Sequence, residues 1–436
     1  MRREATVSEN SKTTIPYFRF DSPPRTLHVH LSAIERAVLY VGVFLAPYAT
    51  LRFSDLFFTF SDFFFCLSLF ILVITGRVWS KPLGEATPLW LIAFTLLFVG
   101  LMIGSLFHNS PERGLVVTAQ YLFAYIFLMF ILIRDEPKEA YRLAAIFLVS
   151  IILIDIHGIL TFYFIGYVPG EGRGVVTGGR RLATLLRNPN LAAAMNALTL
   201  PILLFFWSTG RIKSYVALPV LTLFIATVIL TSSNSGLLVT SMCLFVFTAL
   251  ILTPKLLLRL ALGMGILFAI VGGFGSKDLL PKTFQTRVLG ALSSGDISEA
   301  GTFLSRAALI EEALQMISDE QISLVGIGAD QFRERSVQAV PVHNLYLLLW
   351  IEGGLLALLG WLMFSAIGVL RGFTLSRAGG DKRAFAAMVT TIVVFLTIAL
   401  FNPHMYARYW TIPIFLCCAL ALAQVRGAGK LERGDI

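Results

Sequence analysis

The stretch LVVTAQYLFAYIFLMFILIRDEPKEAYRLAAIFLVSIILIDIHGILTFYFIG (residues 115–166) decides the fold class, because it holds two long apolar runs separated by a short charged segment. The runs, 115–133 and 143–166, each have about the 17 to 25 residues that a helix needs to cross the hydrocarbon core of a membrane. Arg134 and Lys138 lie between them, as expected for a loop at the membrane surface. The stretch therefore predicts a pair of transmembrane helices.

Similar apolar runs recur along all 436 residues of the chain. Hydrophobic residues make up 56% of the sequence and charged residues only 14%, whereas about a quarter of an average soluble domain is charged. Such a chain cannot cover its surface with polar groups, so lipid must cover it. We expect spans near 33–50, 57–75, 88–107, 115–133, 143–166, 191–208, 215–231, 236–253, 257–275, 344–370, 384–401 and 408–425. The sequence predicts an all-α polytopic membrane protein with about twelve transmembrane helices.

The basic residues of the short loops predict the orientation, because cytoplasmic loops carry an excess of Lys and Arg. With both termini in the cytoplasm, the short outer loops hold only Arg52, Arg113 and Arg408. Residues 1–32 lack the apolar core and cleavage site of a signal peptide, so we expect a cytoplasmic tail there, and another at 426–436. The net charge of +9 favours anionic headgroups as partners and not nucleic acid.

The expected domain plan places spans one to nine in 33–275, a large outer loop domain in 276–343 and spans ten to twelve in 344–425. Apolar residues at helical spacing predict an amphipathic helix over 302–318. Its apolar stripe is expected to consist of Phe303, Ala307, Ile310, Leu314 and Ile317, with Arg306 and Glu312 off the stripe. The glycines of GIGADQF (326–332) permit a tight turn, but no helix is evident after them to complete a phosphate site.

The other large outer loop, 167–190, opposes the charge rule. It carries one acidic residue, Glu171, against four arginines, which are Arg173, Arg180, Arg181 and Arg187. Either the loop is simply solvated because later spans fix the orientation, or an anion at the outer membrane surface favours these cations.

Arginine is suited to the second interpretation, because its guanidinium group binds phosphate oxygens bidentately. Arg181 and Arg187, together with Arg306, are candidates to converge on a pyrophosphate at the level of the headgroups. The turn Asn188-Pro189-Asn190 ends the loop and starts a helix, whose first amides would add donors for an anion.

His343 is the most informative histidine, because it lies where the large outer domain enters span ten. There it could take a proton from an acceptor hydroxyl near neutral pH, although a histidine at a helix start is often structural. Asp155 and His157 lie within span five, where they form either a proton relay or a buried pair that fixes helix packing. The carboxylates and the four cysteines show no metal-ligand spacing, so we expect no metal or other cofactor.

Four stretches together resemble the O-antigen ligases and the related O-antigen polymerases and protein O-oligosaccharyltransferases. They are GGRRLATLLRNPNLAA (178–193), LTSSNSGLL (230–238), the segment from SRAALIEEAL to GIGADQF (305–332), and HNLYLLLWIEGG (343–354). The His-Asn pair, followed by an apolar run and Gly-Gly, is the most specific of them. One position departs from the family, which often has arginine where this chain has Ser235.

The resemblance implies a metal-independent, inverting glycosyltransferase of the GT-C-like type in the bacterial inner membrane, with its active site facing the periplasm. The donor would be a glycan on undecaprenyl pyrophosphate, and the acceptor a sugar hydroxyl of lipid A–core. His343 matches the family's proposed base, Arg181 and Arg187 lie in its arginine-containing NPN segment, and Arg306 matches the arginine that opens the periplasmic helix. Three further residues, Arg180, Asn190 and Asn344, are expected to contact substrate.

Three alternatives remain open at this point. An O-antigen polymerase would share these motifs and use a second lipid-linked glycan as acceptor. A protein O-oligosaccharyltransferase usually has a longer C-terminal part. A secondary transporter or flippase fits the span count, but it predicts paired broken helices and does not explain the arginines outside. The compact outer domain favours the ligase.

Overall fold

A computed structural model describes residues 25–53, 58–108, 110–134, 136–169, 174–251, 258, 281–290, 303–377 and 381–432. The elements before the large outer domain are α1 (Arg25–Leu45), α2 (Phe60–Ile74), η1 (Gly84–Ala86), α3 (Thr87–Phe107), α4 (Pro111–Leu122), the π-helical η2 (Phe123–Phe127), α5 (Leu128–Leu132), α6 (Pro137–Phe164), η3 (Thr184–Leu186), α7 (Pro189–Ser208), α8 (Ser214–Thr231) and α9 (Asn234–Ile251). The later elements are α11 (Lys282–Phe284), η4 (Gln285–Gly290), α13 (Phe303–Ile317), α14 (Glu320–Val325), α15 (Gln331–Arg335), α16 (Leu345–Arg377), α17 (Lys382–Ala399) and α18 (Arg408–Glu432).

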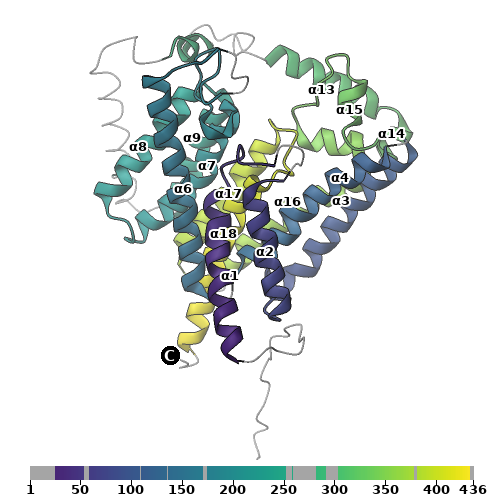
Figure 1. Cartoon of the computed structure of the whole chain (residues 1–436). Helices are drawn as coiled ribbons and strands as arrows, with labels where there is room; N and C mark the ends of the chain where they lie inside the picture. The colour runs from purple at the N-terminus through teal and green to yellow at the C-terminus, as the bar shows by residue number, and fades with distance from the viewer. Residues whose placement is uncertain are drawn as a thin grey trace, which may run out of the picture.

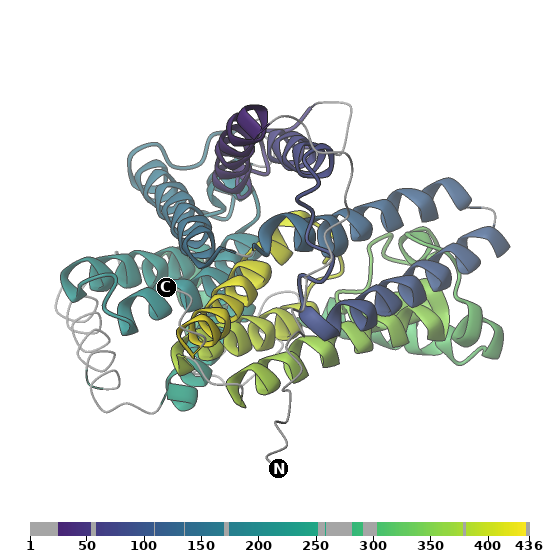
Figure 2. The ribbon, with the colours of Figure 1, turned by 90° about the horizontal axis from the view of Figure 1, so that it is seen from below.

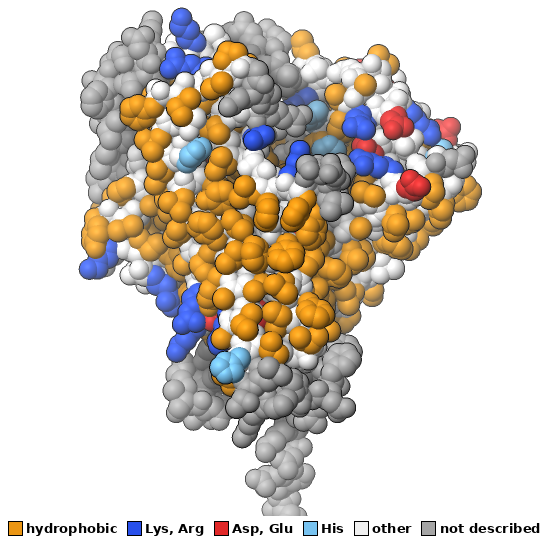
Figure 3. Space-filling view, viewed as in Figure 1, with side chains coloured by type: hydrophobic (Ala, Val, Ile, Leu, Met, Phe, Trp, Pro, Cys, Tyr) orange, Lys and Arg blue, Asp and Glu red, His pale blue; other side chains and the backbone are white. Residues whose placement is uncertain are grey.

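The predicted polytopic helical fold is confirmed. Nine helical segments of the described chain are long and apolar enough to cross a membrane, and hydrophobic side chains cover a broad band of the molecule (Figure 3). Helices coincide with the first eight predicted spans and with the last three. The ninth predicted span, 257–275, lies outside the described residues apart from Leu258, so the count of twelve stays a prediction.

The first residues of α1 and the C-terminal end of α18 lie at one end of the bundle, and α13, α14 and α15 lie at the other (Figure 1). The loop after α6 and the short α11 lie at the same end as α13. We call the group of α13, α14 and α15 the outer lobe. Its core consists of Leu309, Ala313, Ile317, Ile327, Phe332, Val342, Leu348 and Ile351, so the lobe packs directly on α16.

The α13 helix confirms that 302–318 contains a helix, but the predicted apolar stripe is wrong by one position. The buried face is Leu309, Ala313 and Ile317, whereas Leu314 is 50% exposed. Arg306 lies one turn before Leu309 and therefore continues the buried face. A stripe chosen from spacing alone could not identify which of several adjacent apolar rows faces the protein.

Helices α3 and α16 pack closely and extend side by side away from the rest of the bundle (Figure 2). Glycines make this approach possible, as in many membrane helix pairs. A Cβ atom added to Gly100 would lie 2.5 Å from the Ala357 nitrogen, and one added to Gly360 would lie 2.6 Å from the Ala93 carbonyl oxygen. This contact holds α16, and with it the helix start that follows His343.

The α16 helix is broken at Gly354, which has φ 65° and ψ −166°. The N–H groups of Ile327 and Gly328 donate to the carbonyls of Ile351 and Glu352, at 2.8 and 2.9 Å. A Cβ atom on Gly326 would lie 2.5 Å from the Glu352 carbonyl oxygen. The glycines of GIGADQF therefore allow a backbone segment to pair with the broken span. The short α15 follows them, contrary to the expectation that no helix would.

Asp155 and His157 do not form the expected pair. Asp155 is buried in α6, and its Oδ1 accepts a hydrogen bond of 3.2 Å from Asn196 Nδ2 of α7. His157 is exposed on the outer face of α6. Asp155 therefore joins two helices, and the structure gives no support to a proton relay between the two residues.

Candidate functional site

Four residues from segments that are distant in the sequence interact electrostatically at the outer end of the bundle. They are Arg181, Arg287, Arg306 and His343. Arg181 lies in the loop after α6, Arg287 in η4, Arg306 in α13, and His343 two residues before α16. Burial lowers the pKa of Arg181 to about 10, and the charges of Arg287 and Arg306 contribute to this decrease. The positive charges of Arg287 and Arg306 therefore lie near enough to Arg181 to act on it.

Arg181 is held by two hydrogen bonds. Its Nε donates to the Thr231 carbonyl at 2.8 Å, and its Nη2 donates to Asn190 Oδ1 at 3.0 Å. The backbone is also fixed, because Leu182 N–H donates to the Leu230 carbonyl and Ala183 N–H to the Val175 carbonyl. This anchoring orients the guanidinium group before any ligand binds.

The other two arginines carry charge that the protein does not neutralise. Nε of Arg287 is buried without a hydrogen-bond partner, and the Arg287 carbonyl accepts a bond from Asn234 Nδ2 at 3.4 Å. Burial and then the charge of Arg287 lower the pKa of Arg306. Among the residues that the structure describes, no acidic side chain forms an ion pair with Arg181, Arg287 or Arg306. An uncompensated, partly buried group of cations is typical of an anion site.

His343 lies beside this group of cations. Burial lowers its pKa first and the charge of Arg306 second, and the Pro341 carbonyl offsets only part of this. Its Nδ1 is buried and makes no hydrogen bond of good geometry. The imidazole is therefore neutral at pH 7 and able to accept a proton.

The neighbouring Asn344 starts α16. Its Oδ1 accepts hydrogen bonds from the backbone N–H groups of Tyr346 and Leu347, at 3.0 and 3.2 Å. This is a typical N-cap, which orients the helix start next to His343. The Oδ1 atom is thus already occupied, so the expected substrate contact of Asn344 remains a prediction for its amide group alone.

The NPN turn also differs in detail from the expectation. Asn188 Oδ1 accepts from the N–H groups of Asn190 and Leu191, so the first amides of α7 have a partner within the protein. Asn190 is oriented toward Arg181 through its side chain. The predicted contribution of helix amides to an anion site is therefore wrong for these two groups.

Two predicted arginines, Arg187 and Arg180, have other surroundings than Arg181. Arg187 is exposed, has φ 54° and ends η3. Arg180 lies over the Phe162 ring at 5.6 Å from its centroid. No described hydrogen bond or ion pair links either of them to Arg306 or His343. Of the two candidates in the NPN segment, the geometry favours Arg181.

Sequence reasoning missed Arg287 and His404. Arg287 lies in the predicted outer domain but has no recognisable motif around it. His404 follows Pro403 in the short loop between α17 and α18, and the charge of His343 lowers its pKa. Both residues are basic and lie on the expected outer side of the membrane, and this was the only sequence signal that could have marked them as candidates.

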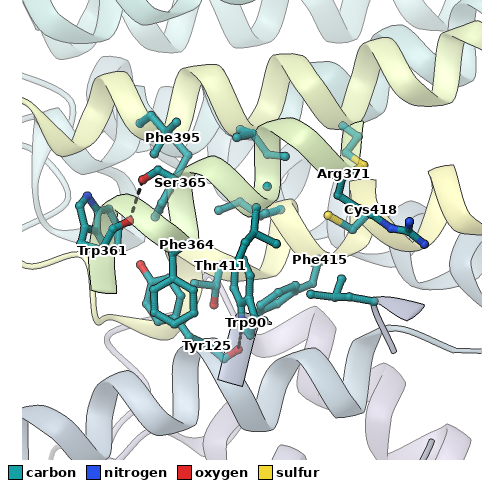
Figure 4. Close-up of a pocket in the computed structure, with 17 residues that line it drawn as sticks. Trp90, Tyr125, Trp361, Phe364, Ser365, Arg371, Phe395, Thr411, Phe415 and Cys418 are labelled. Atoms are coloured by element: carbon teal, nitrogen blue, oxygen red, sulfur yellow. Dashed lines mark hydrogen bonds between the residues drawn. The ribbon is translucent and has the colours of Figure 1, made fainter. Parts of the chain in front are cut away.

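An apolar cavity lies among residues other than those of this site. It has about 600 Å³ of space between α3, α16, α17 and α18, and aromatic and aliphatic side chains line most of it (Figure 4). Two of its polar groups bond within the protein, since Ser365 Oγ donates to the Trp361 carbonyl at 2.9 Å and Trp90 Nε1 to the Tyr125 carbonyl at 2.9 Å. No histidine or carboxylate is among the described residues that line this cavity, so it offers no general base of the kind proposed for His343. Within the described chain, no group of three or more potential metal ligands occurs either.

Comparison with known proteins identifies the relevant family. Residues 218–362 match a family model described as O-antigen ligase. The match includes α8, α9, the described part of the outer domain, His343 and the first half of α16, whereas Arg181 lies before it. No curated protein matches the chain.

The match supports a multi-pass membrane protein with a glycosyltransferase-like activity of the ligase or polymerase type in lipopolysaccharide biosynthesis. It also implies a lipid-linked glycan donor and an acceptor in the membrane. The stretches that carried the resemblance in the second half of the chain thus agree with the match, and residues 218–362 are similar to the O-antigen ligase family.

Proposed function

We propose that the protein is an O-antigen ligase that transfers a glycan from undecaprenyl pyrophosphate to a sugar hydroxyl of lipid A–core at the periplasmic face of the bacterial inner membrane. The observation that carries the proposal is the cluster of Arg181, Arg287 and Arg306, without a described acidic partner, next to a neutral His343. A pyrophosphate supplies the missing negative charge, and a neutral imidazole supplies the base.

In the proposed reaction, the imidazole of His343 removes the proton of the acceptor hydroxyl as its oxygen attacks the anomeric carbon of the donor. The bond between that carbon and the pyrophosphate oxygen breaks, and its electron pair leaves with undecaprenyl pyrophosphate. Attack opposite to the leaving group inverts the anomeric configuration. The arginines stabilise the charge that develops on the leaving oxygen, and such preorganised donors lower the barrier of the transfer step.

The same arrangement supports the proposal that the transfer is metal-independent. In this proposal three fixed guanidinium groups provide the positive charge that a divalent cation would otherwise supply to the diphosphate. Arg181 is the principal contact among the residues of the NPN segment, because the protein anchors its Nε and Nη2 and leaves Nη1 for the ligand. Arg187 is exposed and contributes general electrostatic attraction.

The preference for the ligase over the polymerase rests on the expectation of a single, compact outer domain in residues 276–343. Both termini are expected in the cytoplasm, which places this domain and the loop 167–190 in the periplasm. The preference is open to a direct test, because the two enzymes differ only in their acceptor.

The test is reconstitution of the purified protein with undecaprenyl-pyrophosphate glycan, with and without lipid A–core, in the presence of a metal chelator. We expect a glycosylated lipid A–core product only when lipid A–core is present. Elongated lipid-linked glycan in its absence would instead identify a polymerase. Movement of a solute across vesicles that persists in His343→Ala would identify a transporter.

A further inference from the structure

The junction between α8 and α9, residues 231–235 (TSSNS), bonds to two arginine-bearing segments. Nε of Arg181 donates to the Thr231 carbonyl at 2.8 Å. The carbonyl of Arg287 accepts a hydrogen bond of 3.4 Å from Asn234 Nδ2. Two cations that are distant in the sequence are thus attached to one short stretch of chain, which we call the α8–α9 junction.

We propose that the α8–α9 junction fixes the separation between Arg181 and Arg287, so that the pair binds a diphosphate in preference to a single phosphate. In this proposal Asn234 is the positioning residue for Arg287 and acts on the ligand only through that arginine. The inference rests on the proposed function, because the ligand in question is the pyrophosphate of the donor.

The two attachment points on the junction are close together. Thr231 and Asn234 are three positions apart, and three residues of extended chain span at most about 11 Å. The junction is not extended, because the buried Ser232 between them is left-handed, with φ 50° and ψ 40°. The N–H group of Ser232 also donates to the Ile229 carbonyl at 2.9 Å. The chain therefore turns from α8 into α9 within a few residues.

The start of α9 is fixed against α7. Ser233 caps α9, since its Oγ accepts a hydrogen bond of 3.1 Å from the Gly236 N–H group. A Cβ atom added to Gly236 would lie 2.3 Å from the Ala193 Cβ atom of α7. The first turn of α7 also holds Asn190, whose Oδ1 accepts the second hydrogen bond of Arg181. The junction therefore cannot shift along α7 without disturbing the contacts of Arg181.

A second contact joins the two arginine-bearing segments directly. Oγ1 of Thr283 in α11 donates to the carbonyl of Gly179, two residues before Arg181. Arg287 follows Thr283 by about one helical turn, and its Nε is buried. Both the backbone and the side chain of Arg287 are thus restricted, as those of Arg181 are.

A fixed separation favours a diphosphate for a simple geometric reason. One guanidinium group binds the oxygens of one phosphate bidentately, so two groups held apart match the two phosphates of a diphosphate. A single phosphate engages one group well, and only mobile arginines could close on it together. Fixed groups also lose less conformational freedom when the ligand binds. The pair therefore discriminates against lipid carriers that have a single phosphate.

The experiment measures the binding of inorganic pyrophosphate and of inorganic phosphate to the purified full chain in detergent, by isothermal titration calorimetry with a metal chelator present. We expect the wild type to bind pyrophosphate at least about tenfold more tightly than phosphate. Arg287→Gln should weaken the binding of pyrophosphate about tenfold, as for the loss of a charge-assisted hydrogen bond. Asn234→Ala should weaken it about fivefold and leave the binding of phosphate within about twofold.

A double variant distinguishes positioning from a general structural role. Asn234→Ala added to Arg287→Gln should weaken the binding of pyrophosphate no further, because the effects of residues that act through one contact are not additive. Ser235→Ala is the matched control. It removes a hydroxyl of the same junction, whose described contact is with Ser233 Oγ at 3.3 Å, and it should bind both anions as the wild type does. Asn234→Ser, which is too short to reach the Arg287 carbonyl, replaces Asn234→Ala if that variant does not fold.

Additive losses in the double variant would overturn the positioning role, as would equal losses for pyrophosphate and phosphate in Asn234→Ala. A wild type without preference for pyrophosphate would overturn the whole inference. The proposed ligase function fails by a different result, namely no product from lipid A–core in the reconstitution. Selective binding of pyrophosphate that depends on Asn234 would support the inference even then.

Discussion

Two features of its surroundings, burial and the charge of Arg306, suit His343 to its proposed role as a base. Burial and the positive charge of Arg306 both disfavour the imidazolium form, so the pKa of His343 lies below its usual value near 6.5. A cation that binds the donor thus also keeps the base unprotonated at neutral pH.

Replacing the proposed base should abolish transfer without unfolding the protein. We expect His343→Ala to lower the rate at saturating substrates by at least about 100-fold, the usual contribution of a general base. The measurement is product formation by the reconstituted enzyme, with thermal stability in detergent as the check on folding. Near-normal transfer by this variant would exclude His343 as the base.

The pH dependence should reveal the influence of Arg306 on His343. A lowered pKa keeps the base active below pH 6.5, and activity is lost as the pH falls through that pKa. Arg306→Gln removes the repelling charge, so the pKa of His343 rises and the acidic limb of the rate profile moves to higher pH. A profile of the residual activity between pH 5 and 8 tests this expectation, and an unmoved limb would contradict it.

Arg181 and Arg187 can be separated by conservative replacements. Arg181→Lys cannot retain both the bond to the Thr231 carbonyl and the bond to Asn190 Oδ1, because one ammonium group replaces a rigid fork. We expect at least a tenfold increase in the KM for the donor, or about 1.4 kcal/mol. Arg187→Lys is the control and should have a smaller effect, since Arg187 is exposed. Equal effects of the two replacements would show that the anchoring of Arg181 is unimportant.

At the scale of single residues, the sequence identified those with a recognisable neighbourhood. His343 and Arg306 lie in motifs, and both belong to the cluster described above. Arg287 has no motif, and only the chain fold brings it near Arg181 and Arg306. Asn344 was expected to contact substrate, but a residue directly before an apolar run is equally suited to cap the helix, as it does here.

At the scale of elements, α16 depends on a glycine in the middle of its span. Gly354 adopts a conformation that is essentially restricted to glycine, and a Cβ atom there would lie 2.2 Å from the Leu324 carbonyl oxygen. We expect Gly354→Ala to destabilise the protein by at least about 1–3 kcal/mol from the backbone strain.

Thermal denaturation in detergent measures this loss of stability. Gly368→Ala in the same helix is the matched control, because its Cβ would have only ordinary contacts, the nearest at 3.5 Å. It should leave the midpoint unchanged or raise it, as expected for Gly to Ala within a helix. Equal midpoints for both variants would show that the break at Gly354 is not required.

The apolar runs predicted the helices well because each run has to satisfy its own backbone within lipid. The apolar runs did not predict the break in α16, because Gly353-Gly354 lies within a run that is apolar on both sides. The face of α13 was also misassigned. Its buried side depends on contacts with Ile327, Val342 and Leu348, and no local spacing encodes them.

At the scale of the whole molecule, charge bias predicts which end faces the cytoplasm. Val337, in the outer lobe, is 93% exposed, and Tyr215, at the start of α8, is 71% exposed. A membrane-impermeant maleimide added to spheroplasts should label Val337→Cys directly and Tyr215→Cys only after permeabilisation. Cys66→Ser provides a suitable background, because the other three cysteines are buried. The reverse labelling pattern would invert the orientation and place the arginine cluster in the cytoplasm.

The site as a whole could be predicted only as a list of candidates. Its members come from residues 181 to 343, and their association depends on α7 and α9 packing together and on the outer lobe packing on α16. The sequence indicated that cations collect on one side of the membrane. It could not indicate that Arg181 lies near Arg287 and Arg306 or that Arg187 is exposed.

The pairing of Ile327 and Gly328 with the broken α16 also has a consequence for biosynthesis. The ribosome makes residues 326–328 before it makes α16, so their amides emerge while their carbonyl partners are still absent. The outer lobe therefore cannot complete its core until span ten has entered the bilayer. Assembly of the proposed active site is in this way coupled to membrane insertion, and a nascent chain arrested before residue 345 should leave the lobe open to proteases.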